Sequence, residues 1–204
     1  IASFELTDLP LIKLVSQTKK PLLMSTGMAS EKEIEEAIIT AKENGCKSIL
    51  IFHCVSSYPA VTEQSNLSYI KHLKDTYNIE VGLSDHTLNN SAVISAITLG
   101  ASAIEKHFTI DKNNGVDGEF SLDVEELKDL VKTAKTAWLS IGNGENNRSS
   151  SELENRKFRR SIYFIKDLKA GSLITNKDIR RIMLKDRFAK NPNILTPAQE
   201  KLLR

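Results

Sequence analysis

The first 142 residues alternate between short apolar runs rich in β-branched residues and longer stretches with helical apolar spacing. Parallel strands need long crossover connections, so this alternation predicts a parallel α/β sheet. The runs are nearly continuous, which is typical of strands buried on both faces. The predicted strands are Ile1–Phe4, Pro21–Ser25, Ser48–His53, Glu80–Leu83 and Ala103–Phe108. The predicted helices are Leu9–Gln17, Glu31–Glu43, Asn66–Tyr77, Ser91–Leu99 and Val124–Leu139.

The helix over Glu31–Glu43 has the clearest signals. Ser30 is followed three residues later by Glu33, which is the pattern of a capping box. Gly45 stands where a glycine commonly ends a helix. The apolar stripe with helical spacing consists of Ile34, Ala37, Ile38 and Ala41.

Polar residues follow almost every predicted strand, as they do in barrels whose chemistry lies at the carboxyl ends of the strands. No Gly-x-Gly-x-x-Gly or Walker sequence occurs, which disfavours a nucleotide-binding sheet. A complete barrel has eight strand–helix units in roughly 250 residues. We therefore expect residues 1–142 to be the C-terminal portion of a (β/α)₈ TIM barrel, with about three units missing upstream.

The character of the chain changes after residue 142. Residues 143–157 are rich in Gly, Asn, Ser and Glu, which predicts a linker. The apolar segments Phe158–Ile165 and Ile174–Ile179 follow, separated by a polar turn. Residues 158–204 are therefore expected to begin a second domain, although they are few for an independent core.

Composition narrows the classes of partner. Lys and Arg number 28 and Asp and Glu 26, so a net charge of +2 gives no reason to expect nucleic acid or a membrane surface. The longest apolar runs, such as Ile49–Phe52, fall far short of the roughly 20 residues in a membrane helix. Cys46 and Cys54 form no Cys-x-x-Cys pair and fit a reducing compartment, so we expect a cytoplasmic protein.

Three of the four histidines, namely His53, His86 and His107, lie at predicted strand ends. His86 and His107 end successive strands, and neighbouring strands lie about 4.8 Å apart. Two imidazoles so placed can share one divalent cation at about 2.0–2.1 Å each. The competing interpretation is that each histidine only satisfies the backbone of its loop.

Hydroxyl and carboxylate side chains at the strand ends are further candidates. Ser3, Ser56 and Ser84 can bind phosphate or carboxylate oxygens, although ordinary turn and cap chemistry also explains them. Glu5 is a candidate proton-transfer group or hydroxyl clamp, or else a surface glutamate. Adjacent residues of a strand point to opposite faces, so a Cys54–His53 dyad is not expected.

These motifs together resemble the sialic acid synthase family. The resemblance covers about residues 1–182, and its last part is similar to the opening of that family's C-terminal SAF (antifreeze-like) domain. The segments that carry it are Ile1–Glu5, Ser25–Met28, His53–Pro59, Gly82–Thr87, Glu105–Thr109, Phe158–Ser161 and Lys166–Gly171.

The resemblance implies a (β/α)₈ barrel that condenses phosphoenolpyruvate with an N-acetylated amino sugar, giving a nonulosonic acid and phosphate. It implies that His86 and His107 hold a divalent metal, Mn²⁺ or Mg²⁺, and that the full-length protein is a homodimer. It places Glu5 at the reacting centre. The substrate contacts it implies are Ser3 and Ser84 to phosphoenolpyruvate, Ser56 and Tyr58 lining the same pocket, and Asp117 to sugar hydroxyls.

The product is expected to be pseudaminic acid, because Gly115–Asp117, Phe120–Leu122 and Trp138 resemble pseudaminic acid synthases. His53 instead resembles N-acetylneuraminate synthases, which act on N-acetylmannosamine. A hypothesis of another class is a truncated, non-catalytic remnant or binding protein. A weaker hypothesis, an aldolase with a Schiff base on Lys106, requires that side chain to face the site, whereas alternation predicts that it faces away.

The chain departs from the family pattern near its C-terminal end. Met183–Asp186 stands where the family has an Arg-Pro-Gly stretch. An arginine of the SAF domain normally reaches the partner subunit's active site, and no residue of this chain can be assigned that role.

Overall fold

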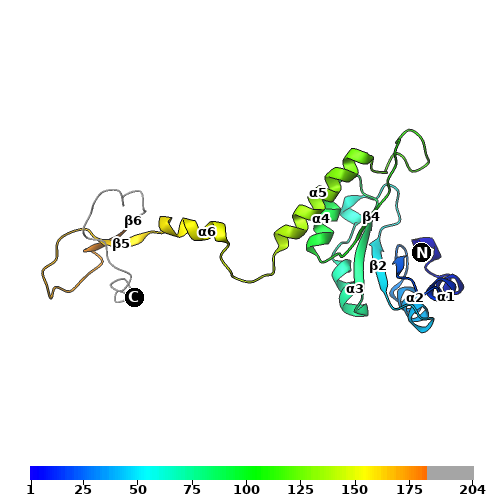
Figure 1. The fold of residues 1–204 in the computed structure, drawn as a ribbon, viewed down its shortest axis with the longest axis horizontal. Coiled ribbons are helices and arrows are strands. Elements are labelled where there is room, and N and C mark those ends of the chain that lie inside the picture. The colour runs from blue at the N-terminus through cyan, green and yellow to red at the C-terminus, as the bar shows by residue number, and fades with distance from the viewer. Residues whose placement is uncertain (183–204) are drawn as a thin grey trace. The chain divides into compact units, whose positions relative to one another are not determined.

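The computed structural model describes residues 1–182. The chain divides into two units, Ile1–Gly144 and the part from Glu145 on, and each is described by itself. In the first unit four parallel strands lie in chain order, and a helix follows each strand (Figure 1). The strands are β1 (Leu22–Ser25), β2 (Ile49–Cys54), β3 (Glu80–Asp85) and β4 (Ile104–Lys106). The helices are α1 (Leu9–Ser16), α2 (Glu31–Glu43), α3 (Tyr69–Tyr77), α4 (Ser91–Thr98) and α5 (Val124–Ile141).

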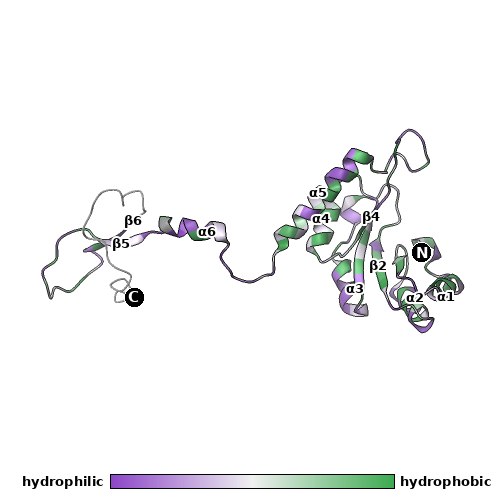
Figure 2. Ribbon diagram, viewed as in Figure 1, coloured by the Kyte–Doolittle hydropathy of each residue, from purple (hydrophilic) through white to green (hydrophobic). Residues whose placement is uncertain are grey.

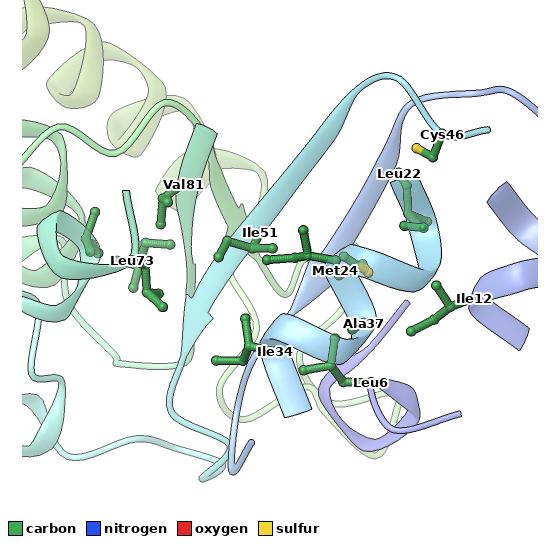
Figure 3. Packing of buried hydrophobic residues seen from close by; sticks show 14 of the residues in the cluster. Leu6, Ile12, Leu22, Met24, Ile34, Ala37, Cys46, Ile51, Leu73 and Val81 are labelled. Carbon is green, nitrogen blue, oxygen red and sulfur yellow. The ribbon is translucent and has the colours of Figure 1, made fainter. Parts of the chain in front are cut away.

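Helix α2 confirms its sequence signals. Ser30 and Glu33 form both hydrogen bonds of the capping box, and Gly45 follows the helix with φ of +96°. All four residues of its apolar stripe are buried. Figure 3 shows side chains from α2, β1 and β2 meeting in one cluster. Figure 2 shows β2 coloured hydrophobic and α2 mixed, as expected for a strand covered by an amphipathic helix.

The prediction of a strand over Ile1–Phe4 is wrong. Ser3–Glu5 forms a 3₁₀ helix, and the Glu5 N–H donates to Ala2. Only Ile1 pairs with β1, since its N-terminal nitrogen donates to Leu23 O and its carbonyl accepts from the Ser25 N–H. The chain thus turns after one strand-like residue, which gives four strands in the first unit rather than five.

The two faces of the sheet have different partners because successive side chains alternate. One face packs against the helices, through residues such as Met24, Ile51 and Val81. The other face borders a cavity at the carboxyl ends of the strands. Strand β4 is shorter than expected and ends at Lys106. Beyond it, His107 and Phe108 pair with Leu122 at the base of the next loop.

The second unit contains the helix α6 (Ser150–Asn155) and an antiparallel pair, β5 (Ser161–Phe164) and β6 (Ile179–Ile182). The helix lies inside the segment predicted as a linker, and a capping box of Ser149 and Glu152 begins it. The partial SAF domain expected over 158–204 stays a prediction, and its residues 183–204 lie outside the described residues. No helix within residues 1–182 has the length and hydropathy to span a bilayer.

Candidate active site

A cavity of about 330 Å³ lies at the carboxyl ends of the parallel strands. It gathers five of the residues predicted for the site, from the N-terminal turn, the loop after β2 and the ends of β3 and β4. These five are Ser3, Tyr58, Ser84, His86 and His107. Cys54 and Glu105 line the same cavity and were not predicted as site residues. Strand alternation could have indicated both, since each lies two residues from a polar residue at the strand end.

The imidazole rings of His86 and His107 are neighbours, with centroids 5.2 Å apart and planes at 64°. The Tyr58 ring lies 4.3 Å from His86 and 5.7 Å from His107, centroid to centroid. Phe120, from the loop after β4, lies 5.1 Å from His107 on another side. The two histidines therefore come together as their spacing predicts, inside an aromatic enclosure that the spacing did not reveal.

The surroundings of His86 decide which of its nitrogens is free. Its Nδ1 atom lies 3.0 Å from Val55 O and 4.0 Å from the Cys54 thiol. A carbonyl can only accept, so in the neutral ring Nδ1 carries the proton and Nε2 keeps its lone pair. Burial lowers the pKa of His86, but its contacts with Cys54 and Val55 outweigh this and raise it overall. Burial raises the pKa of the Cys54 thiol, and hydrogen bonding to His86, Ser3 and Ser56 outweighs this to lower it.

His107 is held from the loop that follows it. Its Nδ1 atom lies 3.7 Å from Asp117 Oδ2, and its carbonyl oxygen accepts a hydrogen bond from the Leu122 N–H at 2.9 Å. Within the loop, Ser121 Oγ donates to Asp117 O at 2.6 Å. Asp117 therefore lies beside the histidine pair, although more than half of its side chain is exposed.

Two serine hydroxyls bracket Gly27. The Gly27 N–H donates to Ser3 Oγ at 3.1 Å. A Cβ atom at position 27 would overlap Ser56 Oγ and lie 2.8 Å from Ser3 Oγ. Only glycine therefore allows the hydroxyls of Ser3 and Ser56 to approach the same backbone, where they can act together on an anionic group.

A family model described as the NeuB family matches residues 1–146. The match covers well over half of the chain. This chain belongs to the NeuB family.

Curated relatives of this NeuB-family chain include two enzymes from Campylobacter jejuni. A pseudaminic acid synthase is 38% identical over 183 residues, covering 89% of this chain and 53% of the relative. An N,N'-diacetyllegionaminic acid synthase is 39% identical over 183 residues, covering 88% of this chain and 55% of the relative. The chain thus spans about half the length of the curated relatives it matches.

A solved structure confirms the α/β fold. The N-acetylneuraminic acid synthetase of Leptospira borgpetersenii, in complex with citrate, matches with a TM-score of 0.70 at 34% identity. The match covers 78% of this chain and 55% of that one. The parallel sheet of the NeuB-family chain is accordingly a curled half-barrel.

Three polar residues of this NeuB-family chain do not line the cavity. Glu5 is exposed on the 3₁₀ helix after Ser3. His53 is buried on the helix-facing side of β2, where its Nε2 lies 2.7 Å from Ser65 O and burial lowers its pKa. Lys106 likewise faces away from the cavity, as alternation predicts, and its ammonium pairs with Asp85, which disfavours a Schiff-base role.

The residues present suit a divalent metal only in part. Within residues 1–182, no three His, Cys, Asp or Glu side chains gather closely enough to hold an ion by themselves. The neighbouring imidazoles of His86 and His107 supply two nitrogen donors and leave positions for water or substrate oxygens. Nitrogen donors suit a first-row ion such as Mn²⁺ better than Mg²⁺, which prefers oxygen ligands.

Proposed function

We propose that this chain provides the histidine-containing half of a nonulosonic acid synthase, which condenses phosphoenolpyruvate with an N-acetylated amino sugar. The observation that carries the proposal is the pair of imidazoles, His86 and His107, with ring centroids 5.2 Å apart beside a cavity that serine hydroxyls also line. The proposed enzyme class is taken from the relatives that are named as synthases.

The histidine pair is proposed as the metal site. His86 and His107 would hold the divalent ion, and Val55 O keeps the Nε2 lone pair of His86 available for it. Such an ion supplies Lewis-acid polarisation of the sugar carbonyl. Tyr58 and Phe120 restrict the ring positions of the two histidines by contact.

Hydroxyl groups of the same cavity are proposed to bind phosphoenolpyruvate. Ser3 and Ser84 line the cavity, and the Ser56 hydroxyl lies beside Gly27 next to Ser3. Oriented hydroxyls bind the carboxylate and phosphate oxygens, and they hold the enol carbon near the sugar carbonyl.

Glu5 and Asp117 are proposed to act on the sugar and on water. In the condensation a C–C bond forms between the methylene carbon of phosphoenolpyruvate and the sugar carbonyl carbon, whose oxygen takes up a proton to become a hydroxyl. Water then adds at the carbon that carries the phosphate ester, and phosphate leaves with its bridging oxygen. Glu5 lies two residues after Ser3 in the N-terminal turn and, although it does not line the cavity, is proposed to orient or deprotonate that water or a sugar hydroxyl. Asp117 would bind sugar hydroxyls beside His107.

Pseudaminic acid is the product we propose. The support is the sequence around Asp117 and Phe120, because the identity of 38% to a pseudaminic acid synthase is matched by 39% to a legionaminic acid synthase. N-acetylneuraminate formation from N-acetylmannosamine is the second candidate, supported by the likeness to the Leptospira enzyme. The homodimer and the cytoplasmic location stay predictions for the full-length protein.

The test is phosphate release by the full-length protein with phosphoenolpyruvate, Mn²⁺ and one candidate sugar at a time. The sugars are the precursors of pseudaminic and legionaminic acid, and N-acetylmannosamine. We expect the pseudaminic precursor to give the highest kcat/KM, and a chelator to abolish turnover until Mn²⁺ is restored. Full activity in metal-free buffer rejects the metal site, and no turnover with any sugar supports the non-catalytic hypothesis instead.

A further inference from the structure

A buried ion pair joins the ends of the two strands that carry the histidines. Asp85 and Lys106 are directly paired in the β3–β4 register. Lys106 Nζ lies 3.0 Å from Asp85 Oδ2, and the two side chains are only 4% and 3% exposed. His86 and His107 are the very next residues of the chain.

Further hydrogen bonds tie this pair to the turn after His86. Lys106 Nζ also donates to Thr87 O at 2.5 Å. Asp85 accepts from the Thr87 N–H at 3.0 Å and from the Thr87 hydroxyl at 3.1 Å. One closed network therefore connects β4 to the residues on both sides of His86.

We propose that Asp85 and Lys106 are positioning residues that fix the separation and orientation of the His86 and His107 rings. The pair lies on the helix-facing side of the sheet, whereas the rings face the cavity, so it acts through the backbone of the two strand ends. That the rings bind a metal rests on the proposed function, whereas the distance between them is observed in the structure.

Stability alone gives a poor reason for this pair. Removing two charges from water costs several kcal/mol per ion, and apolar replacements of a buried pair are often neutral or stabilising. The paired ions, by contrast, specify one geometry, because each charge is satisfied only when the strand ends keep their register. Because Asp85 and Lys106 directly precede His86 and His107, the register that they fix also sets where the two histidine rings lie in the cavity.

The test compares the full-length wild type with the double variant Asp85→Asn/Lys106→Met. This variant removes both charges and keeps an acceptor for the Thr87 N–H. The matched control is Lys74→Met/Glu80→Gln, which removes the exposed pair at the opposite end of β3. The readouts are the thermal midpoint, metal-free NMR contacts among the rings of His86, His107 and Tyr58, and Mn²⁺ affinity by titration.

We expect the double variant to melt within a few degrees of the wild type and to lose the contacts between the two histidine rings. We expect its Mn²⁺ affinity to fall by about 10-fold or more. The control variant should keep the contacts between the histidine rings and the Mn²⁺ affinity of the wild type. Unchanged ring contacts in a folded double variant overturn the proposal.

Two further measurements test the role of the ion pair even if the double variant does not fold or the proposed function is wrong. If the double variant does not fold, Asp85→Glu decides, since it keeps both charges and lengthens the bridge between the two strand ends by one methylene. Weakened ring contacts then support positioning, and unchanged contacts reject it. A wild type that binds no Mn²⁺ contradicts the proposed metal site, while the metal-free contacts still test the ion pair.

Discussion

The Nδ1 atom of His86 lies 3.0 Å from the carbonyl oxygen of Val55, which belongs to the segment after β2. That segment leads to Tyr58, whose ring packs on His86. The Ala60 N–H then donates to His86 O at 2.9 Å. One loop thus holds the tautomer, the ring face and the backbone of the same histidine, as outer contacts of metal-binding histidines do.

Replacing either cavity histidine should remove the proposed condensation activity. His86→Ala or His107→Ala loses one of the two imidazole donors of the proposed metal site, and metal activation is worth several kcal/mol. We expect kcat/KM to fall by about 10²-fold or more, as measured by phosphate release from the full-length protein. His72→Ala is the control, because this histidine is half exposed on α3 and pairs with Glu31. Equal losses in all three variants would contradict the assignment.

Adding one methyl group at Gly27 should disturb the serine hydroxyls. In Gly27→Ala the new Cβ would displace Ser56 Oγ and press on Ser3 Oγ. We expect the KM for phosphoenolpyruvate to rise by about 10-fold, roughly the worth of one charged hydrogen bond. Steady-state kinetics with the sugar held saturating measures this. A normal KM together with an unchanged thermal midpoint would argue against an anion site here.

The core under α2 should respond to truncation on one side of that helix only. Ile34 is 1% exposed and Ile39 is 46% exposed. Ile34→Ala should lower the free energy of unfolding by about 2–4 kcal/mol through lost burial and a cavity. Ile39→Ala should cost less than about 1 kcal/mol. Urea denaturation of both variants measures the difference, and equal costs would show that α2 does not pack as described.

The second unit should lose a stabilising contact in acid. Lys166, together with hydrogen bonds from Thr175, lowers the pKa of Asp178 to about 2. The folded-state pKa lies below the unfolded value of about 3.9, so the contribution is complete above about pH 4 and is lost as pH falls through about 2.

Amide exchange or NMR shifts at Thr175 can follow this change, because its N–H donates to Asp178 at 2.6 Å. The transition should have a midpoint near pH 2 and should be absent in Asp178→Asn. A midpoint near pH 4 would mean that Lys166 and Thr175 do not hold this carboxylate.

Most local elements, and the polar residues at the strand ends, could be predicted from the sequence. The Ser30–Glu33 box and the stripe on α2 depend on residues within a few turns, so they could be predicted without a partner. Strand alternation correctly turned Lys106 away from the cavity and His107 toward it. The strand over Ile1–Phe4 failed because strand pairing depends on a neighbour, and only Ile1 finds one.

Which side chains meet across strands depends on the tertiary structure. The contacts of His86 with Val55 and Cys54, the hydroxyls around Gly27 and the Asp85–Lys106 pair join residues 21 to 32 positions apart. Periodicity gives the face of each side chain, but not the register between strands or the path of the loops. Those follow from packing of the whole sheet against its helices, which sets the distances on which binding chemistry depends.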